Sequence, residues 1–124
     1  MAMEVRAAPG RQIIERYGKG RFRVSGVEHQ GSVLVFPDRT LAWACTSFTD
    51  VDLASLDAVL SHGALDVLLL GCGGRMAMPA PALNAALRAK GIALEPMDTG
   101  AACRTYNVLA TEERRVAAAL SALA

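Results

Sequence analysis

The sequence predicts an α/β fold, with β-hairpins in the first half of the chain and alternating strands and helices in the second. Two observations carry this prediction. Residues 12–45 contain short apolar runs that alternate with polar residues and are separated by turn residues. From residue 49 onward, apolar residues recur at helical spacing between continuous apolar runs. Together they predict a central mixed sheet with helices packed against it.

The length of the chain predicts one domain. Its 124 residues leave little room for two domains, and 52% hydrophobic residues are ample for one core. We therefore expect residues 1–124 to form a single domain, with residues 1–11 as a flexible N-terminus. The early arginines hint at a transit peptide. However, Glu4 and Glu15 interrupt that pattern and no apolar signal core follows, so we expect no targeting segment.

The first half is expected to fold into hairpins. Phe22 and Val24 alternate with Arg21 and Arg23, which places the two arginines on the solvated face of a strand. Further strands are expected over the apolar runs at residues 32–36 and 40–45. The turns that separate these strands are predicted at Gly18-Lys19-Gly20, Gln30-Gly31 and Pro37-Asp38.

The second half is expected to begin with a helix followed by a strand. Thr49 and Asp52 match a capping arrangement, and three leucines then follow at helical spacing up to Gly63, which suits a helix stop. The preceding His62 is expected to interact with the helix dipole. The continuous run at residues 66–70 has an acidic start and is typical of a strand buried on both faces.

A second helix and strand are expected next. Pro79 and Pro81 suit a helix start, and Gly91 ends the helix. The apolar run at residues 92–97 predicts another strand. Pro96 within it indicates the edge of the sheet or the end of the strand, because proline cannot donate a ladder hydrogen bond.

The last part of the chain is expected to hold two helices. Asp98 and Thr99 offer the cap of a short helix that contains Tyr106. Thr111 is then expected to cap a final helix, with two glutamates at the positive end of its dipole. The buried stripe of this final helix would consist of Val116, Leu120 and Leu123.

Composition and charge exclude several classes of protein. The formal net charge is +1, from 13 basic and 12 acidic residues, which gives no electrostatic case for nucleic acid or an anionic membrane. Apolar runs such as residues 67–70 are too short to span a bilayer. An odd number of cysteines at wide spacing indicates a reducing compartment, so we expect a cytoplasmic protein. The cysteines are Cys45, Cys72 and Cys103.

The candidate site lies at the carboxyl ends of the two buried strands. If a right-handed crossover joins these strands, they run parallel and end at the same sheet edge, where open α/β sheets usually bind ligands. The first strand runs into the glycine segment Gly71-Cys72-Gly73-Gly74-Arg75. Its backbone N–H groups could cradle an anion or a carboxylate. The alternative is a tight turn that lets the next helix pack closely.

The second strand runs into a segment with several polar side chains. Arg104 offers a planar donor fork for a carboxylate or phosphate, and Asn107 could share a helix face with Cys103. The alternative is that Tyr106 and Cys103 pack in the core while Arg104 satisfies carbonyl groups or pairs with a carboxylate. The candidate ligand-binding residues are Gly71, Gly73, Gly74, Arg75, Thr99, Arg104, Thr105, Tyr106 and Asn107.

No catalytic group, metal site or cofactor is expected. Cys72 and Cys103 lie in the two converging loops, so a redox pair, a metal pair or a reactive thiol is conceivable. Free cysteine is more often a small buried hydrophobic residue, and neither CxxC spacing nor a neighbouring histidine is present. The chain also has no serine in a nucleophile-elbow motif.

One segment carries a family resemblance. Residues 91–99 read Gly-Ile-Ala-Leu-Glu-Pro-Met-Asp-Thr, and residues 103–109 read Cys-Arg-Thr-Tyr-Asn-Val-Leu. With residues 112–120, they resemble the small-domain family that includes the mitochondrial NADH:ubiquinone oxidoreductase complex (complex I) assembly factor 3 and the adipogenesis-associated domain protein. The similarity covers nearly the whole chain.

The resemblance implies a three-layer domain around a mixed sheet, with no established enzyme activity. It also implies a role in respiratory complex assembly through protein contacts. The shared segment corresponds to Thr99, Arg104, Thr105, Tyr106 and Asn107, with Gly71 and Gly73 in the facing loop. We expect a bacterial cytoplasmic relative, because the chain lacks the mitochondrial extension of the assembly factor.

Two functional hypotheses follow. The first is a non-enzymatic protein-binding or assembly module with an unidentified protein partner, and the high apolar content is compatible with a homodimer. The second is a small-molecule or anion-binding protein, and conceivably an enzyme. It would use the loops at residues 71–75 and 99–107.

Overall fold

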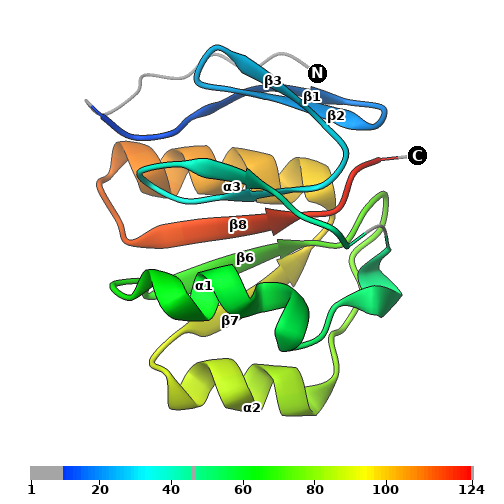
Figure 1. Ribbon diagram of the computed structural model, residues 1–124, viewed down its shortest axis with the longest axis vertical. Coiled ribbons are helices and arrows are strands. Elements are labelled where there is room, and N and C mark those ends of the chain that lie inside the picture. Colours follow the sequence, from blue (N-terminus) through cyan, green and yellow to red (C-terminus); the bar gives the residue numbers. More distant parts are fainter. Residues whose placement is uncertain (1–9, 46, 124) are drawn as a thin grey trace.

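The computed structural model describes residues 10–45 and 47–123, so the predicted flexible N-terminus lies mostly outside the described residues. Two sheets are present (Figure 1). The three-stranded sheet has the order β1-β2-β3, with β1 at Ile14–Gly18, β2 at Arg21–Val24 and β3 at Val27–Gln30. The five-stranded sheet has the order β5-β4-β8-β6-β7, with β4 at Val33–Val35, β5 at Thr40–Ala42, β6 at Val67–Gly71, β7 at Ala93–Met97 and β8 at Val116–Leu120.

The central sheet is mixed, as the sequence predicts. β6 pairs in parallel with β7 and with β8, whereas β4 is antiparallel to β5 and β8. Helix α3 (Thr99–Thr111) packs on one face, and α1 (Asp57–His62) and α2 (Pro81–Ala89) pack on the other. Figure 1 shows the three-stranded sheet beyond α3, on the opposite side of the molecule from α1 and α2. The predicted α/β class and helix-sheet-helix layers are confirmed.

Two hydrophobic clusters cover the two faces of the central sheet. Along β6, Leu69 belongs to the cluster beneath α3, whereas Leu68 and Leu70 belong to the cluster beneath α1 and α2. This alternation is what a strand buried on both faces requires. The cluster under α3 also contains Phe22 and Val24 of β2, so the same helix joins the two sheets.

The hairpins of the first half are confirmed, and one strand is additional. Residues 25 and 26 join β2 to β3, and both have positive φ, 45° at Ser25 and 83° at Gly26. Two central residues with positive φ match the twist of a tight hairpin. β3 was not predicted as a strand separate from β2, because a serine at the first of these positions is a weak turn signal.

The predicted final helix is wrong. Thr111 is the last residue of α3 and caps no further helix. Glu113 has a φ of 59°, which turns the chain away from the helix. The residues assigned to the helical stripe belong to a strand and its extension: Val116 and Leu120 are the two ends of β8, and Leu123 forms a bridge with Lys19.

The alanines of β8 explain this error. Val-Ala-Ala-Ala-Leu has high intrinsic helix propensity, but propensity is a weak preference that tertiary contacts override. Both edges of β8 are paired, with β4 and β6, and every residue of the strand is buried. Ala118 faces the cluster under α3, while Ala117 and Ala119 face the opposite cluster. Small side chains suit a strand enclosed on both faces.

The caps and stops of two helices are confirmed. The backbone N–H of Ala101 donates to Oδ1 of Asp98 at 2.8 Å, so Asp98 caps α3. Pro81 is the first residue of α2, and Gly91 follows the end of that helix with a φ of 78°. These two helices begin where the local sequence predicts.

The first helix is shorter than expected. A 3₁₀ turn at Ala54–Leu56 precedes the six residues of α1, and Thr49 lies in a separate 3₁₀ turn at Phe48–Asp50. Asp52 keeps a capping role, because its Oδ1 accepts from the backbone N–H of Ser55 at 2.8 Å. The predicted helical region therefore exists, with its first part wound more tightly.

His62, at the end of α1, contacts the turn between β4 and β5. Its Nε2 lies 2.8 Å from Oδ1 of Asp38, and its ring stacks on Phe36 with centroids 4.8 Å apart. The hydrogen bond from His62 lowers the pKa of Asp38 from its ordinary value. His62 therefore has a specific partner in addition to the dipole position predicted for it.

β7 is an edge strand of the central sheet, which confirms one of the two positions indicated by Pro96. The backbone N–H of Ala93 donates to Asp66 and the carbonyl of Met97 accepts from Cys72, both across the boundary with β6. Successive residues point their backbone groups to opposite sides of a strand, and residues two or four apart point them to the same side. Pro96 therefore faces away from β6, where its missing N–H costs no ladder hydrogen bond.

We predict that Ala118→Leu lowers the free energy of unfolding by ~1–3 kcal/mol, because the larger side chain overpacks the fully buried position between β8 and α3. Urea denaturation measures the effect. Ala42→Leu, at the exposed end of β5, is the matched control and should change stability little. Equal losses from the two variants would contradict the enclosed position of β8.

Candidate functional site

The two predicted loops meet at the carboxyl edge of the parallel strands. The backbone N–H of Thr99 donates to the carbonyl of Gly73 at 2.8 Å. In return, the N–H of Gly73 donates to Oγ1 of Thr99 at 2.9 Å. The start of α3 and the glycine loop after β6 are therefore in direct contact, as parallel strands predict.

Gly71 allows this close approach. A Cβ at this position would lie 3.0 Å from Cδ2 of Leu120 and 3.1 Å from Cα of Thr99. The second of these is a backbone atom and cannot move aside without shifting α3. Gly73 serves a different purpose, because its φ of 93° is a conformation that other residues rarely adopt. Both glycines are thus needed by the backbone, which is what a tight turn requires.

Thr99 ties three segments together. Its hydroxyl accepts from Gly73 and donates to the backbone carbonyl of Ser121 at 2.8 Å, and its side chain is fully buried. The hydroxyl thereby links the start of α3, the loop after β6 and the residue that follows β8. The hydroxyl therefore already has a hydrogen-bond donor and an acceptor within the protein.

Tyr106 and Asn107 are buried and bonded to the backbone of distant segments. Oδ1 of Asn107 accepts from the N–H of Ile14 at 2.9 Å, and its Nδ2 donates to the Ile14 carbonyl at 2.8 Å. The Tyr106 hydroxyl lies 3.0 Å from the carbonyl of Gln12 and 3.3 Å from that of Phe36. Burial raises the pKa of Tyr106, so its hydroxyl stays a donor.

The arginines of the site have different surroundings. Nη1 of Arg104 donates to the Tyr17 hydroxyl at 3.0 Å, which directs this exposed side chain along α3 toward β1. Arg75 and the neighbouring Gly74 are exposed in the loop that leads to α2. Thr105 is half-buried on α3. Of the predicted binding residues, the exposed ones are therefore Gly74, Arg75 and Arg104.

The cysteines lie in separate environments. Cys103 belongs to the cluster under α3, whereas Cys72 packs against the cluster on the other face of the central sheet. The sheet between these clusters argues against a redox pair. Burial raises the pKa of Cys103 to about 12 and also raises the pKa of Cys72 and Cys45. All three cysteines are free thiols, and a raised pKa makes them weak nucleophiles at neutral pH.

Two findings bear on metal and membrane binding. In residues 10–45 and 47–123, the His, Cys, Asp and Glu side chains form no group of three or more that could hold a metal ion. Within the same part of the chain, no helix combines the length and apolar character needed to cross a bilayer.

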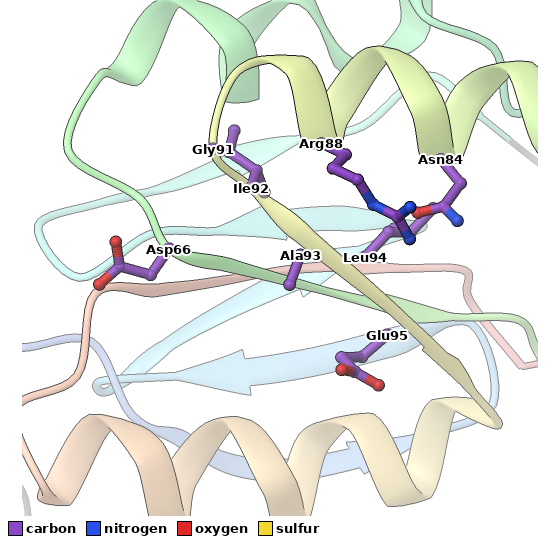
Figure 2. Close-up of a pocket in the computed structure, with 8 residues that line it drawn as sticks. All are labelled: Asp66, Asn84, Arg88, Gly91, Ile92, Ala93, Leu94 and Glu95. Atoms are coloured by element: carbon purple, nitrogen blue, oxygen red, sulfur yellow. The ribbon is translucent and has the colours of Figure 1, made fainter.

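A groove that was not predicted from the sequence lies between α2 and the edge of β7 that faces away from β6. One part of it, with a volume of about 400 Å³, is lined by residues that include Asn84, Arg88 and Leu94. Figure 2 shows Arg88 and Asn84 projecting from α2 over Leu94, whereas Glu95 points to the opposite side of β7. A smaller, more apolar hollow of about 170 Å³ continues from Asn84 toward Met78. The sequence signal that could have indicated this groove is an amphipathic helix followed by a strand that Pro96 places at the sheet edge.

Comparison with known proteins identifies similar chains. A family model described as "Protein of unknown function (DUF498/DUF598)" matches residues 14–121. An uncharacterised protein of Rhodobacter capsulatus is 43% identical over 107 residues, which cover 86% of this chain and 82% of that protein. The NADH dehydrogenase [ubiquinone] 1 alpha subcomplex assembly factor 3 of Xenopus tropicalis is 35% identical over 109 residues, or 87% of this chain. This chain spans only 60% of the length of the frog protein.

A solved structure has the same fold. The crystal structure of an outer membrane protein from Bartonella henselae superposes with a TM-score of 0.86 at 36% sequence identity. The match covers 94% of this chain and 98% of that one. The arrangement of two sheets around α3 therefore recurs in a related sequence.

We predict that Gly71→Ala destabilises the protein by ~1–3 kcal/mol, because the new Cβ meets the backbone of Thr99. Gly74→Ala is the matched control, since a Cβ there has no heavy atom within 4 Å. Thermal and urea unfolding compare the two variants. A Gly71→Ala protein as stable as Gly74→Ala would show that α3 does not depend on this close approach.

Proposed function

We propose, from the premise that the chain belongs to the DUF498/DUF598 family, that it is a non-enzymatic protein-binding domain that assists the assembly of a respiratory NADH dehydrogenase. The observation that carries the proposal is the 35% identity to the frog assembly factor over 109 residues. This similarity extends over 87% of the chain. Because the frog protein is longer, the shared domain accounts for part of that factor only.

The chemistry of the site supports a binding role over a catalytic one. Thr99, Tyr106 and Asn107 use their polar atoms to hold the chain's own backbone. The thiol pKa of Cys103 is raised by burial, which opposes formation of the reactive thiolate. Three of the polar residues predicted to bind a ligand are thus explained by folding.

The partner under this proposal is a protein, namely a subunit or an assembly intermediate of the dehydrogenase. The three free cysteines favour a reducing compartment, so we place this activity in the cytoplasm. Assembly factors hold subunits transiently, and transient interfaces are more polar than obligate ones. The binding surface is therefore expected to combine apolar and charged side chains.

A second candidate function is anion or carboxylate binding at the carboxyl edge of the sheet. It is favoured by the contact between the two loops and by the exposed side chain of Arg75 beside Gly73 and Gly74. A thermal-shift titration with phosphate and small dicarboxylates tests this function. A stabilisation that Arg75→Ala removes would support it, and an unchanged midpoint across the titration would count against it.

The assembly role predicts a specific defect. Deleting the gene for this chain in the organism that encodes it should lower the amount of assembled NADH dehydrogenase severalfold, because subunits or intermediates lose the protein that holds them. Native gel electrophoresis with an activity stain measures the assembled enzyme. Succinate dehydrogenase is the control and should be unchanged. Normal NADH dehydrogenase in the deletion strain would refute the proposal.

A further inference from the structure

We infer that the groove between α2 and the free edge of β7 binds an extended segment of a partner protein, with an acidic and an apolar side chain two positions apart. The inference rests on the proposed protein-binding function and names the surface that performs it. It is carried by the unpaired backbone of β7, the shape of the two hollows beside it and the charge of Arg88.

Within residues 10–45 and 47–123, no strand pairs with the outer edge of β7. Ala93 and Met97 use their backbone groups toward β6, so the N–H and C=O of Leu94 and the C=O of Pro96 point away from the sheet. An extended chain alongside can bond to these groups and add a strand. Pro96 supplies an acceptor and no donor, which restricts the register of such a strand. It also lowers the tendency of the edge to pair with arbitrary strands.

The apolar end of the groove can take one side chain. Its lining includes Met78, Pro79, Pro81 and Pro96, and its volume of about 170 Å³ suits a single aliphatic residue. Met78 is 72% exposed, so most of its apolar side chain faces solvent. Methionine adapts its shape to different partners because it is flexible and unbranched. Covering this hollow would remove apolar surface from water.

The other end of the groove carries Arg88, and its lining also includes Asp66 and Glu95. Arg88 projects over Leu94 on the α2 side of β7 (Figure 2), and the ion pairs formed among the described residues do not include it. The side chain of Glu95 points to the opposite side of the strand, and Asp66 is already paired with Arg115 at 2.8 Å. An arginine at a groove favours a carboxylate, which its planar fork can bind through two hydrogen bonds.

The spacing of the two ends fits an extended chain. Asn84 lines both hollows and lies one helical turn before Arg88, about 5–6 Å along the axis of α2. Side chains two positions apart on one face of a strand are separated by about 6.6–6.8 Å. An acidic residue at Arg88 and an apolar residue at the Asn84 end of the smaller hollow therefore match alternate positions of one strand. Asn84, which lines both hollows, can bond to the partner's backbone.

The experiment places a photo-crosslinking residue at position 84 of the full chain, expressed in the organism that encodes it. Position 28, on the exposed strand β3, is the control. We expect a crosslink from position 84, well above that from position 28, to a dehydrogenase subunit or assembly intermediate. Mass spectrometry of the crosslinked peptide should locate an extended segment that carries the acidic-x-apolar pattern.

Charge reversal then tests the recognition itself. Arg88→Glu should reduce the crosslink about tenfold or more, and changing the partner's acidic residue to lysine should restore it. Arg16→Glu, an equal change of charge at an exposed position of β1, is the control and should leave the crosslink unchanged. Circular dichroism checks that both variants fold, and Arg88→Gln provides a milder second variant.

Three results would overturn the inference: no crosslink from position 84 above the control, a crosslink to a second copy of this chain, or a crosslink that Arg88→Glu leaves intact. Complementation of the deletion strain distinguishes a failure of the groove inference from a failure of the proposed assembly role. If the wild-type gene and the Arg88→Glu gene both restore NADH dehydrogenase, only the groove is refuted. If the deletion has no effect on the enzyme, the assembly role is refuted as well.

Discussion

The structure depends on the buried polar side chains of α3. The amide of Asn107 bonds both backbone groups of Ile14, by accepting from its N–H and donating to its carbonyl. Tyr106 bonds to two further backbone carbonyls, one of them before β1. The three-stranded sheet has a further backbone contact with the end of the chain. Lys19 forms a bridge with Leu123, and the N–H of Gly20 donates to the Leu123 carbonyl. Buried backbone groups need partners, and α3 supplies them from its side chains.

Local signals predicted the elements whose ends are defined by nearby residues. Asp98 and Pro81 mark helix starts through capping chemistry and a fixed φ, and the apolar run ending at Gly71 marks a buried strand. β8 could not be recognised in this way, because its alanines favour a helix and only pairing with β4 and β6 selects a strand. β3 was missed for a related reason, since its turn places Ser25 in a conformation typical of glycine.

The candidate site shows the same division. The meeting of the glycine loop with Thr99 follows from parallel strands and was predictable. The partner of Asn107 lies 93 residues away in the sequence, so its structural role was visible only in the fold. The groove beside β7 was hidden for the opposite reason: each of its residues looks ordinary, and only the edge position of the strand makes the combination informative. A motif rich in polar residues can thus hold segments of the fold together, whereas the residues of a binding groove need not form any sequence motif.

Hydrogen exchange on Asn107→Ala tests the central claim that α3 holds the three-stranded sheet through its side chains. We expect amides of β1 and β2 to lose most of their protection, because Ile14 loses both of its hydrogen bonds to Asn107, while amides of β6 and β8 keep theirs. Asn84→Ala, the same substitution at a partly exposed position of α2, should leave both sheets protected. Equal protection of β1 in Asn107→Ala and the wild type would contradict the account.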